Sequence, residues 1–423
     1  MESTSFNLGL AMLDDARGFR EAAAAVSSVL LRRFGTHRLD LVEDAVQDAF
    51  VAATRRWPLQ GAPQQPLAWL IRVAERRYLD RLRPERRLAP DADVHLESAP
   101  APDPSATPEG EDDQLRLLFM CCHPSLSAES RVALTLKTVA QLSVDEIGRL
   151  LCAAPSAVAQ RIVRAKRSLH DVRPSFVVPE GEALVARLDD VLAVVYAIFT
   201  AGHLPTADES QRRMELCGEA LRLVRLLLAS PATATADGQA LAALLYFTSA
   251  RLPANSDEAV VSLAQQDRSR WDQRAIAMGA RALAASATGT QRTRYHLEAE
   301  IACLHVTSPT YADTPWDRIV AVYDDLLRST PTPAIQLARL VALAEAGHAA
   351  VALEELEAQR LGLERALGDW AGWPAAMGFL HERAGDFSTA SGFYHQALTF
   401  DIPEPVRRFW EDARDRLGGS RAP

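Results

Sequence analysis

Lysine is almost missing from this chain of 423 residues, and Lys137 and Lys166 are the only two that it contains. Neither lysine follows a glycine, which excludes the Walker A loop that binds nucleotide phosphates. The sequence also lacks the GxSxG, HExxH and GxGxxG segments that are typical of serine hydrolases, zinc proteases and dinucleotide-binding enzymes. We therefore predict a protein that is not an enzyme and that uses no cofactor.

Cysteine is scarce too, and its five residues are odd in number and scattered: Cys121, Cys122, Cys152, Cys217 and Cys303. This usage favours reduced thiols in a cytoplasm over a disulfide framework. The Cys-Cys-His run at 121–123 is not followed by a second CxxC or HxxxH that would complete a tetrahedral set. The HxE at 296–298 lacks the P-C-x-x-C partner of zinc deaminases. We therefore predict no metal site.

Long apolar runs and aromatic residues are also in short supply. No uninterrupted apolar run is long enough to span a bilayer, and no basic segment precedes an apolar core at the N-terminus. We expect a cytoplasmic protein with no membrane partner. Aromatic residues make up only 6% of the chain, alanine and leucine dominate, and alternating Val, Ile and Thr are hard to find. These features predict an all-α fold, and the length predicts two or three domains.

Charge is divided unevenly along the sequence. Residues 1–175 hold equal numbers of acidic and basic residues, so the whole of the net charge of −9 lies in the remainder. Within the neutral part, basic residues cluster at Arg72–Arg87 and Arg161–Arg173. Local clusters of this kind are typical of nucleic-acid binding.

The segment Leu142–Leu169 has the pattern of a helix-turn-helix. Ser143 and Glu146 fit the S-x-x-E capping box of a first helix, and Pro155 suits the first turn of a second one. Apolar residues recur at helical spacing in the second helix and are expected to face inward: Val158, Ile162, Ala165 and Leu169. Its other face is polar and basic, which suits the major groove and the flanking phosphates. An ordinary helical hairpin with a solvated face is the alternative.

Three further helices are expected nearer the N-terminus, at Phe19–Phe34, Asp40–Trp57 and Leu67–Leu82, with Pro58 ending the second. Residues 84–111 are rich in Pro, Ala and acid, and they predict a flexible linker.

The chain is helical again from residue 184 onward and contains a weak internal repeat. EAGHAAVALEEL aligns with RAGDFSTASGFY, which pairs Gly347 with Gly385 and Ala352 with Ala390. Such units resemble tetratricopeptide repeats. An unrelated helical bundle is the alternative.

Taken together, these blocks resemble a known family. DLVEDAVQDAFVAA is similar to the core-binding helix of bacterial sigma factors, PLAWLIRVAERRYLDRLR to the promoter-melting segment that follows it, and the helix-turn-helix to the domain that reads the upstream promoter element. Their order and single linker resemble the extracytoplasmic-function (ECF) class. The C-terminal part, including QDRSRWD at 266–272, resembles the subgroup with a fused tetratricopeptide-like extension.

The resemblance implies sigma region 2 at 10–83, an acidic linker at 84–111, sigma region 4 at 112–173 and a regulatory helical-repeat domain at 184–418. The face that it implies for core RNA polymerase consists of Glu43, Asp44, Gln47, Asp48 and Phe50. The residues implied at the −10 element are Trp69, Arg72, Arg76, Arg77, Asp80 and Arg81. Those implied at the −35 element are Ser156, Gln160, Arg161, Arg164, Lys166 and Arg167.

The residue types in these sets agree with such roles. Acidic and amide side chains suit basic helices of the polymerase, with a merely solvated first turn as the alternative. Arginines beside an aromatic ring suit unpaired bases, although Trp69 also fits a core anchor. The family commonly has Asn at the position of Arg76, and Thr and Lys at those of Ala157 and Ala159, so two common phosphate contacts are absent.

The expected function is therefore that of a bacterial sigma factor, which directs core RNA polymerase to specific promoter DNA. The acidic C-terminal part, tethered to basic DNA-binding helices, is expected to regulate this in cis, either by competing with DNA or by supporting the folding of its neighbours. It also leaves room for a protein partner. Two alternatives stay open, a helix-turn-helix regulator that is not a sigma subunit and a repeat-type protein-binding scaffold.

Overall fold

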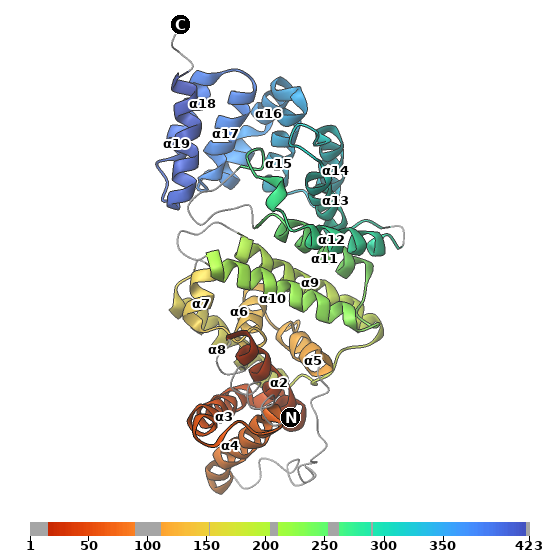
Figure 1. Cartoon of the computed structure of the whole chain (residues 1–423), viewed down its shortest axis with the longest axis vertical. Coiled ribbons are helices and arrows are strands. Elements are labelled where there is room, and N and C mark those ends of the chain that lie inside the picture. Colours follow the sequence, from red (N-terminus) through yellow and green to blue (C-terminus); the bar gives the residue numbers. More distant parts are fainter. Residues whose placement is uncertain are drawn as a thin grey trace. The chain divides into compact units, whose positions relative to one another are not determined.

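All regular elements in the described part of the chain are helices (Figure 1). The computed structural model describes residues 16–88, 111–151, 153–203, 210–252, 262–288 and 291–419. The predicted all-α fold is confirmed for these residues. The chain divides into two compact units, which are described separately: Met1–Ala201 with Ala229–Thr233, and Gly202–Leu228 with Ala234–Pro423.

The first unit begins with a three-helix group made of α2 (Ala16–Phe34), α3 (Leu39–Gln60) and α4 (Pro66–Leu88), with the short 3-10 helix η1 (Thr36–Arg38) between the first two. Its core holds Trp57, 2% exposed, and Tyr78, 1% exposed. The Tyr78 ring stacks on Phe34 with centroids 4.3 Å apart. Burial of large aromatic rings at the crossing of the three helices supplies much of the stability of this group.

Two prolines lie inside helices, and one of them, Pro58, was expected to end its helix. Pro58 is within α3, which continues until Gly61 takes a φ of 83° and donates its N–H to the Trp57 carbonyl at 2.9 Å. Similarly, α4 runs past Pro84 to Leu88, so the predicted ends at Trp57 and Leu82 are wrong. A proline removes one backbone hydrogen bond, whereas a glycine at positive φ turns the chain away, and here the glycine is the stronger stop. The rest of the predicted linker, 89–110, lies outside the described residues.

Four helices of the helix-turn-helix part follow in the same unit: α5 (Glu111–Cys121), α6 (Ala128–Thr138), α7 (Val144–Leu150) and α8 (Pro155–Val172). The next helix, α9 (Gly181–His203), is also part of this unit. Arg187 of α9 donates to the Phe119 carbonyl and lies 5.6 Å from the centre of the Phe119 ring, while Arg131 of α6 pairs with Asp190. The compact unit therefore extends past the predicted domain limit at residue 173.

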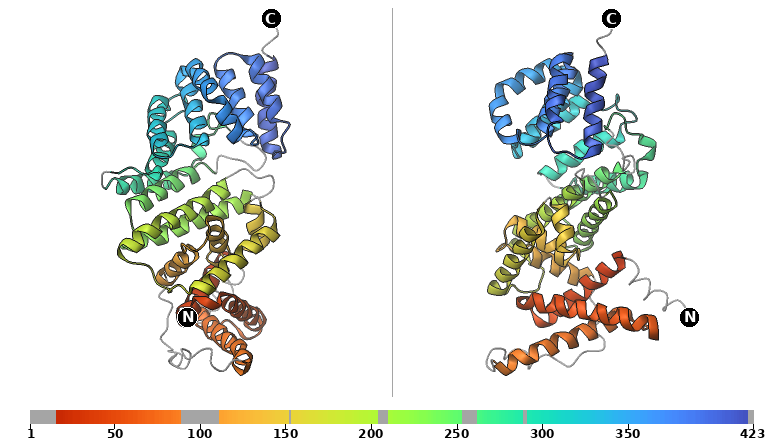
Figure 2. Two further views of the ribbon diagram at one scale, coloured as in Figure 1. Left: turned by 180° about the vertical axis from the view of Figure 1, so that it is seen from behind. Right: turned by 90° about the vertical axis from the view of Figure 1, so that its left-hand side faces the viewer.

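From residue 236 onward, each α-helix of the second unit packs on the next one in the chain (Figure 2). The elements of this unit are α10 (Ser210–Ala229), α11 (Ala236–Ser249), η4 (Arg268–Arg270), α12 (Gln273–Ser286), α13 (Arg294–Thr307), α14 (Trp316–Ser329), α15 (Pro333–Leu343), η5 (Ala344–His348), α16 (Ala349–Leu367), α17 (Gly372–Arg383), α18 (Phe387–Ala397) and α19 (Glu404–Gly419). Nearest-neighbour packing of this kind is the topology of helical-repeat proteins.

The internal repeat read from the sequence has a counterpart in the backbone. Gly347 and Gly385 both take a left-handed φ, 90° and 82°, at the turn that leads into α16 and α18. Ala352 and Ala390, five residues further along in each helix, are both fully buried. A side chain would be strained at this φ, which is why glycine recurs at the turn. The two helix pairs therefore use the same turn and the same small-residue crossing.

One stretch departs from the expectation that no apolar run is long enough for a membrane. Pro333–Leu367 is long and apolar enough to cross a membrane, with a mean hydropathy of 1.2 over its most apolar window. It comprises α15, η5 and α16, and Gly347 breaks the regular helix within it. Leu340 and Leu356 from its two halves pack into one buried cluster of the second unit. In all, 33% of its most apolar window is buried inside the unit.

Candidate polymerase and promoter interface

The helix-turn-helix is built by the local signals seen in the sequence. The Ser143 hydroxyl accepts the Glu146 N–H at 3.2 Å, and the Glu146 carboxylate accepts the Ser143 N–H at 2.7 Å, which confirms the predicted capping box. Pro155 occupies the first turn of α8, as predicted. The four residues expected to face inward, Val158, Ile162, Ala165 and Leu169, are the buried residues of α8. The opposite face of α8 is thereby fixed toward solvent.

The turn between α7 and α8 leaves no room for a side chain at Gly148. A Cβ at this position would lie 2.8 Å from the Ala153 carbonyl oxygen, and the Ala153 N–H donates to the Gly148 carbonyl at 2.8 Å. We expect Gly148→Ala to destabilise the first unit by about 1–3 kcal/mol, because the turn must open to relieve the clash. Thermal unfolding measures this loss, and Gly218→Ala, where nothing lies within 4 Å of the added carbon, is the matched control. Equal stability of the two variants would contradict the packing described.

The outer face of α8 carries the residues predicted for the −35 element. Ser156, Gln160, Arg164 and Arg167 are exposed, and Arg161 is half-buried. Arg164 also donates to the Gln160 carbonyl one turn earlier at 3.3 Å, which holds its guanidinium along the helix. The structure thus places these five side chains on one surface, as a reading helix requires.

The residues predicted for the −10 element divide into two groups on α4. Arg72, Arg76 and Arg77 are exposed. Trp69 is half-buried and packs edge-on against Trp57 with centroids 5.5 Å apart, so it has both an anchoring contact and an open face. Asp80 is half-buried as well.

Arg81 was predicted to contact DNA, but in the structure two carboxylates bind its side chain. Its guanidinium donates to Asp44 and to Asp48 of α3, each at 2.8 Å. Two carboxylates one turn apart on α3 therefore hold this arginine in a fork. Its place in the described structure is that of a clip between α3 and α4.

The predicted polymerase face lies on α3, with one exception. Asp44 and Gln47 are exposed, whereas Glu43 and Asp48 are half-buried. Phe50 is only 3% exposed and packs against Phe19 with ring centroids 4.4 Å apart. The prediction of Phe50 as a contact residue is therefore wrong, because its ring belongs to the core beneath the acidic face.

A predicted −35 residue and a predicted polymerase residue meet directly. The Lys166 ammonium of α8 lies 2.8 Å from the Glu43 carboxylate and 2.5 Å from that of Asp40. Partial burial opposes the charge of Lys166, but the two carboxylates outweigh it and raise its pKa. Next to this contact, the His170 ring lies within hydrogen-bond distance of the His37 carbonyl, at 2.7 Å.

Comparison with known proteins identifies this arrangement. A family model described as Sigma-70 region 2 matches residues 19–88, and one described as Sigma-70, region 4 matches residues 116–169. The chain belongs to the ECF-like sigma factors. A family of unknown function (DUF6596) matches residues 187–287 of its C-terminal extension.

Two relatives show how far the similarity to this sigma factor extends. An uncharacterized protein of Rhizobium meliloti, R00370, is 34% identical over 345 residues, which cover 78% of this chain and 80% of that protein. The ECF RNA polymerase sigma-E factor of Escherichia coli is 29% identical over 136 residues, or 30% of this chain and 71% of that protein. No solved structure matches the chain. Because it covers 78% of the chain, the similarity to R00370 includes much of the extension, whereas the sigma-E match covers 30% of the chain.

The sequence reasoning missed several contacts of the sigma factor. It gave no partner to Asp40, His37, Arg187 or Asp190. These residues find their partners in helices far away in the sequence, for example Lys166 for Asp40 and Arg131 for Asp190. Helical periodicity reports which face of a helix is buried but not which helix covers it, so no local signal could have paired them.

The signals that suggested metals have structural explanations. Cys121 and Cys122 are fully buried, and burial raises the pKa of the Cys122 thiol to about 12. Within the described ranges, no group of three His, Cys, Asp or Glu residues is placed to hold a metal ion. Cys152 lies outside those ranges. The described thiols are thus packed in the core or partly covered.

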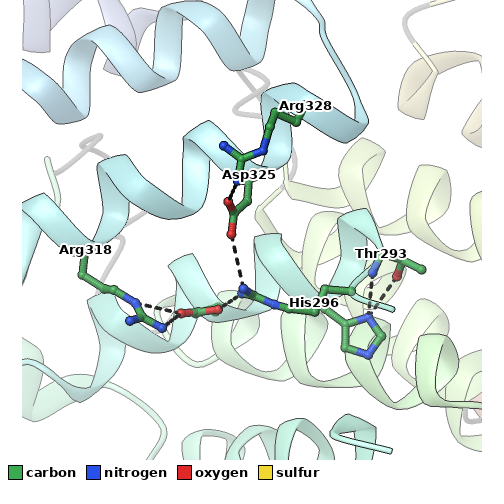
Figure 3. A network of polar contacts seen from close by, with 7 residues as sticks. Thr293, His296, Arg318, Asp325 and Arg328 are labelled. Carbon is green, nitrogen blue, oxygen red and sulfur yellow. Dashed lines mark hydrogen bonds and ion pairs between the residues drawn. The ribbon is translucent and has the colours of Figure 1, made fainter. Parts of the chain in front are cut away.

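His296 of the HxE at 296–298 lies at the start of α13, where its ring faces Thr293 (Figure 3). The His296 ring accepts the Thr293 N–H at 3.2 Å, and Glu298 pairs with Arg294. Beside them, a surface network joins α13 to α14, in which Glu300 binds Arg318 at 2.7 Å and Asp325 binds Arg292 and Arg328. Exposed pairs of this kind contribute little individually.

Proposed function

We propose that α3 of this sigma factor docks on core RNA polymerase, that α4 engages the −10 element, and that α8 reads the −35 element. The observation that supports this most directly is the capped helix-turn-helix with Gln160, Arg161 and Arg164 on its outer face, in the same compact unit as the acidic face of α3. An operator-binding regulator needs no such acidic face. A sigma factor needs both surfaces, one for the enzyme and one for the promoter.

The contact between α3 and α8 represents a closed arrangement in this proposal. The −10 and −35 elements are about 25 base pairs apart, which at 3.4 Å per pair is roughly 85 Å of duplex. In the structure, Lys166 of α8 touches Glu43 of α3. The helices that read the two elements must therefore separate before both can be bound. The 22 residues between Leu88 and Glu111 permit a separation of this order, since an extended chain spans at most about 3.3–3.6 Å per residue.

The C-terminal extension, in this proposal, regulates in cis. It carries the whole of the acidic excess of the chain, whereas the DNA-reading helices are basic on their outer faces. An acidic body tethered to such helices competes with DNA for them. The extension also takes part in the first unit through α9, whose Arg187 and Asp190 bind the region that carries the helix-turn-helix. Removal of the extension must therefore leave α9 in place if region 4 is to keep its packing.

Run-off transcription with purified core polymerase on a library of promoter fragments tests the proposal. We expect specific initiation from the full chain. Arg161→Ala and Arg164→Ala should each lower the affinity for the selected −35 sequence by about 1–3 kcal/mol, because each removes a charged contact to a base or phosphate. Arg360→Ala, an exposed arginine of α16, is the matched control. Absence of initiation with DNA binding intact would favour the regulator instead.

A further inference from the structure

A pocket of about 430 Å³ lies within the second unit, between α13, α14, α15 and α17. One of its walls is a face of α15 that is built of small residues. Ala334, Ala338 and Ala342 are spaced four residues apart on this helix, so they share one face, and all three line the pocket. Short side chains at this spacing leave space beside the helix. The volume of that space is in the range of small-molecule sites.

Aromatic rings from the neighbouring elements complete the wall. They are Tyr311 before α14, Trp316 and Tyr323 of α14, Trp370 before α17, and Phe379 of α17. The rings of Tyr311 and Trp316 pack edge-on with centroids 5.4 Å apart. Apart from His305 and Glu345, every described residue that lines the pocket is apolar or aromatic. Apolar walls with few polar groups are typical of sites that bind small organic molecules.

Trp370 gives this wall a large apolar ring that remains in contact with water. Its side chain lines the pocket, yet the residue is 56% exposed. A tight turn holds it there, in which the Trp370 N–H donates to the Leu367 carbonyl at 2.9 Å. A Cβ at Gly372 would lie 2.1 Å from Trp370 Cζ2, so the ring can take this position only because residue 372 is a glycine. Exposed aromatic rings beside a pocket are typical of binding surfaces.

The carboxylate on the wall, that of Glu345, is already compensated within the protein. It accepts the Tyr311 hydroxyl, and its oxygen lies 2.7 Å from the Arg383 guanidinium. The Glu345 side chain is only 7% exposed. Charge-assisted hydrogen bonds of this kind are strong, so a cationic ligand would have to displace Arg383 to gain this carboxylate. The wall therefore does not favour a cation.

The other titratable groups on the wall are uncharged near pH 7. Burial, together with Arg251 and Arg268, lowers the pKa of His305 to about 4, so its ring is neutral. Burial raises the pKa of Tyr323 to about 12, so its hydroxyl stays protonated. Among the described residues that line the pocket, none is a lysine or an arginine that could bind an anion. Because a charge is costly to remove from water without a counter-charge, the wall favours a neutral ligand.

We propose that this pocket binds a small neutral aromatic molecule, held by apolar and ring contacts between the alanine face of α15 and the aromatic wall. Such a ligand covers the Trp370 ring and removes apolar surface from water, which is favourable. It contacts α15 and α17, which precede and follow the turn at Gly347, and so stabilises the folded extension. The site belongs to the extension alone and is independent of the promoter contacts proposed above.

Calorimetric titration of the full chain with naphthalen-1-ol, a neutral aromatic probe, tests the proposal. We expect saturable binding with a stoichiometry of one, and a rise in the melting temperature of the extension. Naphthalene-1-sulfonate and naphthalen-1-ylmethylammonium carry the same ring system with a negative and a positive charge. Each should bind at least about tenfold more weakly, because the wall offers neither charge a free partner. Non-saturable partitioning, or equal binding of the three probes, would overturn the assignment.

A variant that fills the pocket locates the bound probe. Ala338→Leu adds three carbon atoms to the middle of the alanine face, and we expect it to weaken naphthalen-1-ol binding at least about tenfold. Ala302→Leu makes the same change at a half-buried alanine of α13 that does not line the pocket. This matched control should leave the affinity unchanged. Equal affinity of the two variants would show that the probe binds elsewhere.

A second variant removes the exposed ring and does not depend on packing in the interior. Because Trp370 is 56% exposed, we expect Trp370→Ala to stay folded, as thermal unfolding can verify, and to weaken binding about tenfold through the lost ring contact. Phe387→Ala removes another exposed ring, 46% exposed, that does not line the pocket, and should not change the affinity. Unchanged affinity in Trp370→Ala, or an equal loss in Phe387→Ala, would refute the assignment.

Discussion

Reversing the charges of Asp44 and Asp48 together, as Asp44→Lys with Asp48→Lys, is expected to abolish promoter-specific initiation by this sigma factor. Both carboxylates lie on the outer side of α3, and each is more than one third exposed. Removing one partner of a charge pair at a protein interface costs about 2–5 kcal/mol of binding free energy, and reversing its charge adds repulsion. We expect the affinity for core polymerase to fall by at least about 100-fold, as measured by fluorescence anisotropy in the absence of DNA.

The same substitutions also break the clip between α3 and α4, so a control must separate the two effects. Arg81→Ala removes both ion pairs and leaves the acidic face intact. Because all three side chains are substantially exposed, we expect this variant to lose at most about 1 kcal/mol of stability and to keep its affinity for core polymerase. If Arg81→Ala weakens core binding as much as the charge reversal does, α3 acts through its packing on α4, and the proposed polymerase face is wrong.

Local features of the fold could be predicted from the sequence because their causes are local. The capping box of α7, the proline at the start of α8 and the buried stripe of α8 each depend on residues within a few turns of one another. The paired turns at Gly347 and Gly385 belong to the same class, since a left-handed φ is a property of one residue. The predicted helix end at Pro58 was wrong, because the context of the last turn decides whether the helix continues.

Tertiary contacts could not be predicted, and they change the meaning of several candidate residues. Phe50 lies on the predicted helix, but its direction relative to α2 decides that it is buried. Arg81 and Lys166 were both assigned to DNA, yet in the structure both hold carboxylates of α3. A basic side chain on a helix surface looks the same in the sequence whether its partner is a phosphate or an aspartate. Only the fold shows that part of the predicted DNA surface covers part of the predicted polymerase surface.

The contact of Lys166 with α3 leads to a second prediction with a large effect, the yield of a chemical cross-link. Because the chain has so few lysines, a cross-link to Lys166 can be assigned without ambiguity. Carbodiimide joins a lysine to a carboxylate in direct contact, and Lys137 is the other lysine of the chain. We expect the free sigma factor to yield an amide between Lys166 and Glu43 or Asp40, detected by mass spectrometry of the digested protein. The Asp40 product should dominate, because the carbodiimide must reach a carboxylate from solution to activate it, and Asp40 is 76% exposed whereas Glu43 is 22% exposed.

Binding of core polymerase and promoter DNA should remove this cross-link. If α4 and α8 read elements separated by about 85 Å of duplex, Lys166 cannot stay within 3 Å of Glu43 in the initiation complex. We expect the yield to fall at least tenfold when both partners are present.

Loss of a partly buried ion pair costs about 2 kcal/mol or more, so Glu43→Gln should also favour the open form in the free protein. Lys166→Arg, which keeps the charge but cannot form the amide, identifies the product. An undiminished cross-link in a complex that initiates transcription would mean that α3 and α8 stay together on the promoter. The assignment of α8 to the −35 element would then have to be abandoned.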